Sequence, residues 1–430
     1  MRTTNSITGK APAAVLQLVS SSAVIPSTFV LREVRQLREL GFEMVIGQLR
    51  PVLRDMNLSG FDELADIVVK PRWLSLECLS GILYYAMKQP NRLWRYVALI
   101  FRCAPEFKNL IKMIYVLFAS VILAYRHRVY RAGHVRAHFL HTEALAAYFV
   151  SGLLQVPYSI TVHTVVVRFH TQVVREVLQK ASFLVADTHQ VYEFLQLEGV
   201  PCERIRLIRN GLRLDELTFQ HKSVISTPPI VLAAGYLVPK KGFEFLLKAC
   251  HLLRQRRVRF RCLVVGDGVE RSKLNKLISG LGLESEVEML GDLSFEELKK
   301  RYYHAAIFVM PSVTVSDGAT DGLPTVVLES MACGTPVIGT RTAAIPEVVF
   351  DGKTGLLVPA GDPEAIADRI ELLLSEDALR SSLAREGRHL IEREFDLQRN
   401  SQTLAGLILS HLNIPGPSVL SILDPEVSLK

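Results

Sequence analysis

The sequence is poor in the signatures by which many enzymes are identified. Its six cysteines are scattered and include no Cys-x-x-Cys pair, so we interpret them as reduced thiols of a cytosolic protein rather than as disulfides or metal ligands. No cluster of His or Cys has the spacing of metal ligands, and we expect no metal. A Walker-type phosphate loop and a Gly-x-Ser-x-Gly nucleophile elbow are also missing.

Long hydrophobic runs are scarce too, and the N-terminus, MRTTNSITGK, has no signal-peptide core. The longest apolar run, Met113–Tyr125, is shorter than the roughly 20 residues that span a bilayer. It lies among the basic residues Arg92, Arg95, Arg102, Lys108, Lys112, Arg126, Arg128, Arg131 and Arg136. Two interpretations stay open: a buried core helix, or a helix that rests on an anionic membrane. We expect a cytoplasmic protein, with peripheral attachment at the inner face of the plasma membrane through residues 92–136 as a hypothesis.

Hydrophobic residues and basic charge, in contrast, are plentiful. With 430 residues, two domains are more natural than one. Hydrophobic residues make up 49% of the chain and charged residues 22%, which is typical of a globular protein. The net charge of +7 suits phosphate-bearing ligands, an acidic membrane face or nucleic acid. No nucleic-acid-binding motif occurs, so we expect no nucleic acid partner.

Short apolar runs alternate with helical patterns along both halves of the chain. This alternation predicts parallel sheets wound right-handedly, so the expected class is α/β, with two doubly wound Rossmann-like domains facing a cleft. Ligands of such sheets bind at the carboxyl ends of the strands. The loops expected at these ends follow Val162, Ala234, Val265 and Met310.

The polar segment 215–228 ends in a pair of prolines and suggests a link between the domains. We expect an N-terminal Rossmann-like domain over residues 1–212 and a C-terminal Rossmann-like domain over residues 213–395. Residues 396–430 would form a helix and tail that can cross back to the N-terminal domain.

The most informative stretch is Pro311–Thr340, where an apolar strand is followed by a loop and then by a helix that starts near Pro324. The loop places Asp321 beside the helix N-terminus, and Glu329 lies about two turns along the helix. A helix N-terminus attracts phosphate, whereas ionised carboxylates accept hydrogen bonds from vicinal hydroxyl groups. A nucleotide-sugar, with a diphosphate between two polyhydroxylated ends, meets both demands. An ordinary strand–loop–helix unit with a solvated Asp and a capped Glu is the alternative.

Three other loops follow apolar strands. The loop 235–242 carries Lys240 and Lys241, which either neutralise a diphosphate leaving group or belong to a solvated turn. The Gly-Asp-Gly turn at 266–268 is too short for a dinucleotide fingerprint, and we interpret it mainly as structural. His163 ends a strand and could contact substrate, although a lone His is more often a satisfied structural group.

Taken together, these stretches resemble the retaining, family-four glycosyltransferases. The match is dense and in order over residues 230–395 and thinner in the first half. Its segments are GYLVPKKGFEFLL, VVGDGVERSKL, VEMLGDLSFEELKKRYYHAAIFVMPS, DGLPTVVLESMACGTPVIGT and IPEVVFDGKTGLLVPAGD. The first resembles the family's lysine-bearing glycine loop and the fourth its Glu-x7-Glu box. In type, the chain is most similar to the bacterial colanic-acid and exopolysaccharide enzymes.

The resemblance implies a GT-B fold that needs no metal or other cofactor. A UDP- or GDP-sugar donor would bind the C-terminal half, and a saccharide or lipid-linked saccharide acceptor would bind mostly the N-terminal half. As catalytic residues, Glu329 would hold the donor ribose, Asp321 the transferred sugar and Lys241 the diphosphate, with His163 near the sugar. The remaining donor-binding positions would be Gly235, Lys240, Gly242, Gly322, Leu323 and Thr325. The implied reaction is sugar transfer with retention, in exopolysaccharide or cell-surface polysaccharide biosynthesis.

Three positions depart from the family pattern, because Tyr236 replaces an Arg, Asp321 replaces a Glu and Val166 replaces an Asp. Each change removes or shortens a charged group and can weaken catalysis. A nucleotide-sugar-binding protein with weakened catalysis is therefore one alternative. A nucleotide-sugar epimerase on a similar two-domain fold is another, although the C-terminal loops fit it less well.

Overall fold

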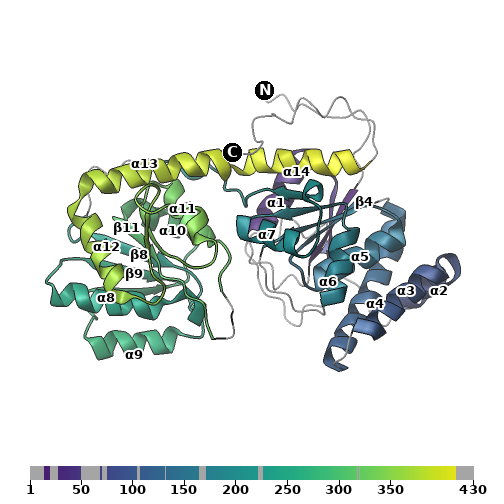
Figure 1. The fold of residues 1–430 in the computed structure, drawn as a ribbon, viewed down its shortest axis with the longest axis horizontal. Coiled ribbons are helices and arrows are strands. Elements are labelled where there is room, and N and C mark those ends of the chain that lie inside the picture. Colours follow the sequence, from purple (N-terminus) through teal and green to yellow (C-terminus); the bar gives the residue numbers. More distant parts are fainter. Residues whose placement is uncertain are drawn as a thin grey trace. The chain divides into compact units, whose positions relative to one another are not determined.

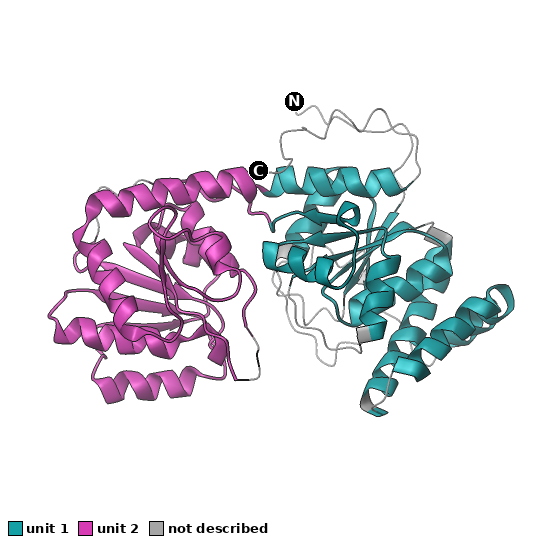
Figure 2. Ribbon diagram, viewed as in Figure 1, with its two compact units in different colours: residues 1–210, 397–430 teal, residues 211–396 magenta. Residues whose placement is uncertain are grey.

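The computed structural model describes residues 14–19, 28–49, 68–69, 75–103, 107–130, 132–163, 171–220, 226–316, 318 and 320–412. The chain divides into two compact units (Figure 2). Unit 1 comprises residues 1–210 and 397–430, and unit 2 comprises residues 211–396. The predicted boundaries lie at 212 and 395, and the observed ones at 210 and 396.

Unit 1 contains one parallel sheet with helices around it (Figure 1). Its strands are β1 (Ala14–Val19), β2 (Met44–Gln48), β3 (Val68–Val69), β4 (Ala132–His138), β5 (Tyr158–Val162), β6 (Phe183–Ala186) and β7 (Ile205–Leu207). Its helices are α1 (Thr28–Glu39), α2 (Leu76–Lys88), α3 (Pro90–Cys103), α4 (Phe107–Tyr130), α5 (Thr142–Leu154), α6 (Thr171–Lys180), α7 (His189–Leu197) and α14 (Leu397–His411). The sheet order is β3-β2-β1-β4-β5-β6-β7. One apolar cluster joins the sheet to α1 and α14, and a larger one joins it to the other helices.

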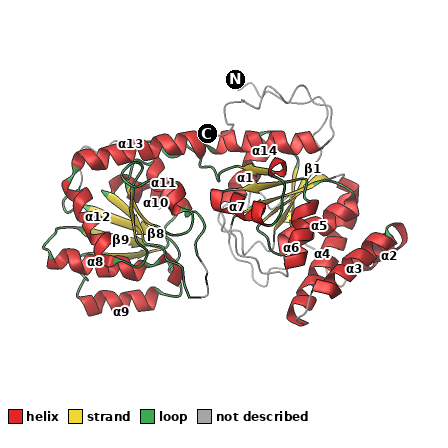
Figure 3. Ribbon diagram, in the orientation of Figure 1, coloured by secondary structure: helices red, strands yellow, loops and turns green. Residues whose placement is uncertain are grey.

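Unit 2 repeats this plan with a six-stranded parallel sheet in the middle (Figure 3). Its strands are β8 (Ile230–Ala234), β9 (Arg261–Val265), β10 (Val287–Gly291), β11 (Ile307–Met310), β12 (Val337–Thr340) and β13 (Leu356–Val358). Its helices are α8 (Phe243–Gln255), α9 (Arg271–Leu281), α10 (Phe295–His304), α11 (Thr325–Ala332), α12 (Pro363–Ser375) and α13 (Asp377–Glu394). One apolar cluster joins the sheet to α8, α9 and α12, and another joins it to α10, α11 and α13.

The strand order of unit 2, β10-β9-β8-β11-β12-β13, reverses direction between β8 and β11. The order of unit 1 reverses in the same way between β1 and β4. Such a reversal is the topological switch point of a doubly wound sheet, and ligands bind beside it at the carboxyl ends of the strands. The predicted α/β class with two doubly wound domains is therefore confirmed.

Local sequence signals account for many element boundaries. β11 is an apolar run of four residues, all buried, as expected of a central parallel strand. α10 begins with a capping box, in which the Ser294 hydroxyl accepts from the Glu297 N–H and the Glu297 carboxylate accepts from the Ser294 N–H. α9 ends at Gly282 in the left-handed conformation, which is the common way for a helix to stop.

The apolar run that the sequence singles out belongs to α4. The segment Asn109–Arg128 is long and apolar enough to cross a membrane, and 56% of its apolar stretch is buried within unit 1. Met113, Val116 and Val121 belong to the core of the unit, where α4 packs against α5. The buried side of α4 therefore agrees with the first of the two predicted interpretations, a core helix.

The chain leaves unit 1 after Asn210 and returns at Leu397. In each unit, a hydrogen bond joins the two segments at which the chain passes from one unit to the other. In unit 2 the Leu212 N–H donates to the Phe395 carbonyl at 2.7 Å, and in unit 1 the Asn400 amide donates to the Arg209 carbonyl at 2.9 Å. The last described helix, α14, thus belongs to the unit that begins the chain.

Candidate functional site

The predicted site lies at the switch point of unit 2, where the loops after β8 and β11 meet. The two strands are neighbours in the sheet, so their carboxyl ends bring the loops together. The Val313 N–H donates to the Lys240 carbonyl at 2.9 Å. A Cβ atom on Gly242 would stand 2.0 Å from the Pro311 carbonyl oxygen, and Gly242 has a φ of +66°. Only glycine permits this approach of one loop to the other.

Lys241 and Asp321, 80 residues apart in the sequence, form an ion pair at this point. Lys241 lies in a short 3-10 turn, Pro239–Lys241, that leads into α8. Its side chain is 10% exposed and that of Asp321 is 13% exposed. Lys240 adds a second ammonium group 3.4 Å from Asp321 Oδ1. The structure therefore brings together three of the residues that the sequence singles out.

The aliphatic part of Lys241 lies over the backbone of Gly235. A Cβ atom at Gly235 would be 3.4 Å from Lys241 Cε. The turn at 266–268 supports the same loop, because the Leu237 N–H donates to the Asp267 carbonyl at 2.9 Å. The predicted structural role of that turn agrees with this contact. Tyr236, which stands where the family has Arg, is 60% exposed.

The remaining predicted donor residues belong to the loop before α11 and to the helix itself. Gly322, Leu323 and Thr325 are half-buried around the N-terminus of α11. The N-cap residue is Pro324, whose side chain makes no capping hydrogen bond. The first N–H groups of α11 therefore have no side-chain cap from this residue, as a phosphate-binding helix end requires.

Glu329 lies inside α11 and is 4% exposed. The Tyr302 hydroxyl of α10 donates to Glu329 Oε2 at 3.2 Å. Sequence reasoning identified Glu329 but missed Tyr302, because a tyrosine in an amphipathic helix carries no local sign of a carboxylate partner 27 residues away.

His163 lies in unit 1, directly after β5, and is 6% exposed. Its Nδ1 atom is 2.8 Å from Asp187 Oδ2, and its Nε2 atom is 2.9 Å from His138 Nδ1. Both ring nitrogens therefore have partners within unit 1. A contact with a sugar hydroxyl would require His163 to exchange one of these hydrogen bonds. Val166, the third departure from the family pattern, lies outside the described residues.

The contacts of His163 continue through His138 to Glu33, whose Oε1 atom is 3.2 Å from His138 Nε2. Burial opposes ionisation of Glu33, but Arg136 and then His138 outweigh it and hold its pKa below the usual range. Burial lowers the pKa of His138 to about 4, against the opposing effect of Glu33. Glu33 is thus the ionised acceptor and His138 the neutral ring in this line.

The line of contacts runs from Asp187 through His163 and His138 to Glu33. The amide of Asn210 also donates to Asp187 Oδ2 at 2.9 Å, which fixes the outer end of the line.

Sequence reasoning gave His138 and Glu33 no role, and it placed Arg136, which is buried, at the end of the predicted membrane segment. A signal was present: His134, Arg136 and His138 alternate along β4. Alternate residues of a strand share one face, so a buried polar face was implied. Arg136 lies within 2.8 Å of both carboxylate oxygens of Glu33, which is 103 residues away in the chain. The partner could not be inferred from spacing.

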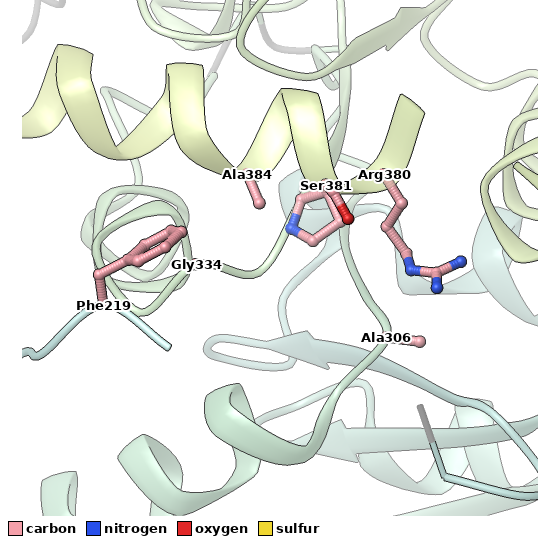
Figure 4. Close-up of a pocket in the computed structure, with 7 residues that line it drawn as sticks. Phe219, Ala306, Gly334, Arg380, Ser381 and Ala384 are labelled. Atoms are coloured by element: carbon pink, nitrogen blue, oxygen red, sulfur yellow. The ribbon is translucent and has the colours of Figure 1, made fainter. Parts of the chain in front are cut away.

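A small hollow lies elsewhere in unit 2, lined among others by Phe219, Gly334 and Arg380 (Figure 4). The space of about 10 Å³ that it leaves for the centre of a water molecule is room for about one water. It also lies at the amino end of the sheet, beside Ala306 and Pro336, which precede β11 and β12. It is therefore neither large enough nor suitably placed for a sugar nucleotide.

Among the residues that the structure describes, no group of three or more His, Cys, Asp or Glu side chains could hold a metal ion. The chemistry available at the switch point of unit 2 is that of two ammonium groups, one nearby carboxylate and an uncapped helix end. This set suits an anionic diphosphate that carries hydroxyl-rich groups.

Comparison with known proteins identifies the fold to which this site belongs. The chain superposes on the crystal structure of Anabaena Alr3699/HepE in complex with UDP with a TM-score of 0.71 and 17% identity, over 93% of this chain and 100% of that one. At this identity the likeness establishes the fold, which is that of the two-domain GT-B glycosyltransferases.

Residues 215–390 match the model of the family described as glycosyl transferases group 1. The chain is 28% identical to a protein named as the colanic acid biosynthesis glycosyltransferase WcaL of Salmonella typhimurium, over 89% of this chain and 96% of that protein. It is 30% identical to the amylovoran biosynthesis glycosyltransferase AmsK of Erwinia amylovora, over 49% of this chain and 52% of that protein. The chain is a glycosyltransferase whose C-terminal unit contains a group 1 domain.

Proposed function

We propose that the chain transfers a sugar from a UDP- or GDP-sugar with retention of the anomeric configuration, without a metal ion. The observation that carries the proposal is the cluster of Lys240, Lys241 and Asp321 at the switch point of unit 2. A structural neighbour, Alr3699/HepE, has been solved with UDP and with UDP-glucose, which supports a nucleotide-sugar donor.

The donor diphosphate would replace Asp321 as the partner of the two lysines. A diphosphate brings more negative charge than one carboxylate, so it competes well for both ammonium groups. Once displaced, the Asp321 carboxylate is available to accept hydrogen bonds from the transferred sugar. Thr320 Oγ1, in the same loop, is buried without a hydrogen-bond partner among the described residues, and a donor hydroxyl would satisfy it.

The other predicted donor contacts follow from the same geometry. Gly322, Leu323 and Thr325 present backbone groups at the N-terminus of α11, where a phosphate is favoured. Gly235 and Gly242 allow close approach of the backbone. Glu329 would hold the ribose hydroxyls, with Tyr302 orienting its carboxylate.

In the proposed reaction the bond from the sugar C1 to the diphosphate oxygen breaks. The acceptor hydroxyl oxygen forms the new bond on the same face of the sugar, and its proton passes to the departing phosphate. Lys240 and Lys241 stabilise the negative charge that develops on the leaving group, which is the role that a metal ion would otherwise fill.

The acceptor proposed is a saccharide or lipid-linked saccharide, bound mostly by unit 1, in exopolysaccharide or cell-surface polysaccharide biosynthesis. The named functions of WcaL and AmsK support this assignment. The reaction would take place in the cytoplasm, at the inner face of the plasma membrane.

Acceptor-dependent release of UDP or GDP from a donor panel tests the function. Lys241→Ala and Glu329→Ala should each lower kcat/KM by about 100-fold or more, because each removes a charged group aimed at the donor. Lys276→Ala, which alters an exposed lysine of α9, is the matched control. Unchanged turnover in both site variants would reject the proposal.

Exposed Tyr236, in place of the family's Arg, favours one second candidate: a protein that binds the donor on the same fold but has lost its transfer activity. Calorimetric binding of a nucleotide-sugar without turnover over a broad acceptor panel would support it. Turnover in the wild type would exclude it.

A further inference from the structure

The outer face of α2 is apolar along its whole length. Leu76, Leu79, Leu83 and Met87 are 84%, 56%, 54% and 80% exposed. Their spacing of three or four residues places them on one side of the helix. The opposite side packs on α4 through buried Cys78, Gly81 and Tyr85, so α2 buries one side and exposes the other.

Exposed apolar side chains also occur on α3 and α4, which lie with α2 at one end of unit 1 (Figure 1). Of the fourteen exposed large hydrophobic side chains among the described residues, nine lie on these three helices. On α3 they are Trp94 and Phe101, and on α4 they are Phe107, Ile111 and Phe118. A soluble surface rarely concentrates apolar groups in this way unless it contacts a partner. We call these nine residues the α2–α4 apolar surface.

The charge of this region indicates the chemistry of the partner. Residues 76–130 contain eight Lys or Arg and two Glu, so they carry +6 of the chain's net charge of +7. Arg95 and Arg102 are exposed on α3 beside Trp94 and Phe101. Glu77, one of the two acidic residues, is already paired with Arg126. The α2–α4 apolar surface is therefore bordered by unneutralised positive charge.

Apolar stripes bordered by arginine, with an exposed Trp, are the composition of helices that lie in a membrane interface. We infer that the α2–α4 apolar surface docks on an anionic phospholipid bilayer, with Leu79, Leu83 and Trp94 entering the acyl boundary and Arg95 and Arg102 contacting lipid phosphates. α4 stays in the core of unit 1 and does not cross the bilayer, because more than half of its apolar stretch is buried there.

This surface overlaps the one that the sequence indicated, residues 92–136, and extends beyond it. Trp94, Phe101, Phe107, Ile111 and Phe118 lie within that range, whereas the exposed stripe of α2 precedes it. More than half of the apolar stretch of α4 is buried, and so is Arg136 at the end of the predicted range. The inference deepens the proposed function, since it names the partner that would bring the enzyme to a lipid-linked acceptor.

Co-sedimentation of the full-length protein with vesicles tests the inference. The vesicles contain phosphatidylglycerol and phosphatidylcholine in one arm and phosphatidylcholine alone in the other, without donor or acceptor. The wild type should sediment with the anionic vesicles only. Leu79→Glu combined with Leu83→Glu should weaken binding by about tenfold or more, because two charges enter the lipid-facing stripe. Leu197→Glu, at a residue 84% exposed on α7, should leave binding unchanged.

A second pair of variants tests the charge. Arg95→Glu and Arg102→Glu should each weaken anionic binding by about fivefold or more, whereas Arg385→Glu on α13 should not. The inference is overturned if the wild type does not bind anionic vesicles, or if the stripe variant binds as well as the wild type. It is also overturned if the wild type is a dimer without vesicles and the stripe variant a monomer, since the surface then joins two copies. Because no sugar transfer is measured, these outcomes are independent of the proposed reaction.

Discussion

At the scale of single residues, the site depends on a contact between two loops that only glycine allows. Gly242 has a φ of +66°, and a side chain there would meet a backbone carbonyl of the neighbouring loop, at Pro311. A backbone atom cannot move aside as a flexible side chain can. The position of Lys241, the residue before it, depends on this contact.

We predict that Gly242→Ala destabilises unit 2 by about 2 kcal/mol or more, because it adds a clash to a left-handed conformation. Donor binding should weaken with it. Chemical denaturation and calorimetry measure the two effects. Gly280→Ala is the control, because that helical glycine has open space around it and should gain up to about 1 kcal/mol. Equal stability of Gly242→Ala and wild type would show that the loops adapt freely.

The buried histidines of unit 1 make its stability depend on pH. Burial lowers the pKa of His134 to about 3 and that of His138 to about 4, from 6.5. The unfolded chain therefore binds these protons first as the pH falls. The stabilisation is complete above pH 6.5, decreases below it, and is lost once the pH has fallen through the folded values.

We predict a loss of about 2 kcal/mol per histidine between about pH 6.5 and about pH 5, since one pKa unit corresponds to about 1.4 kcal/mol. Chemical denaturation at the two pH values measures it. The loss of unfolding free energy should be smaller in His134→Gln than in the wild type, by the contribution of one histidine. An unfolding free energy that is the same at both pH values would contradict the prediction.

The sequence predicted which residues lie at the candidate site, but it did not predict which side chains pair with one another. Lys241 and Asp321 were both assigned to the donor, in loops at the carboxyl ends of parallel strands, and the structure brings the two side chains together. Their direct ion pair was not predicted, because no local pattern shows which ammonium group a carboxylate meets. The same limit hid the pairing of Glu33 with Arg136.

At the scale of elements, the helices and strands form largely where apolar periodicity places them. The expected strand ends at Val162, Ala234, Val265 and Met310 are those of the structure. β8 and β11 are buried on both faces and are unbroken apolar runs in the sequence. The start of β4 was missed, because His134 and Arg136 are polar and are buried through tertiary contacts. The exposed face of α2 was missed because a periodic apolar stripe predicts burial.

The last helix among the described residues, α14, covers one face of the unit 1 sheet. Leu404, Ala405 and Ile408 pack in one cluster with residues of α1, β1 and β6. We predict that Ile408→Ala destabilises unit 1 by about 2–5 kcal/mol, the range for truncating a buried Ile. Ser410→Ala, on the exposed side of the same helix, should change stability by less than about 0.5 kcal/mol. Similar effects of both changes would mean that α14 is not part of the core.

At the scale of the whole molecule, two units of the same strand order carry different sets of groups at the carboxyl ends of their strands. Unit 2 presents lysines, a carboxylate and a helix N-terminus, which suit a sugar nucleotide. Unit 1 has a buried line of histidines and carboxylates, and it carries the α2–α4 apolar surface. This difference agrees with the proposed function, in which the second unit binds the donor.

Calorimetric titration of UDP- and GDP-sugars into the wild type and into Lys241→Ala tests the central claim, that the lysine–carboxylate cluster of unit 2 binds the donor. The wild type should bind one donor saturably, and Lys241→Ala should bind it about 100-fold more weakly, since the ammonium group that meets the diphosphate is gone. Equal affinities for the two proteins would contradict the claim.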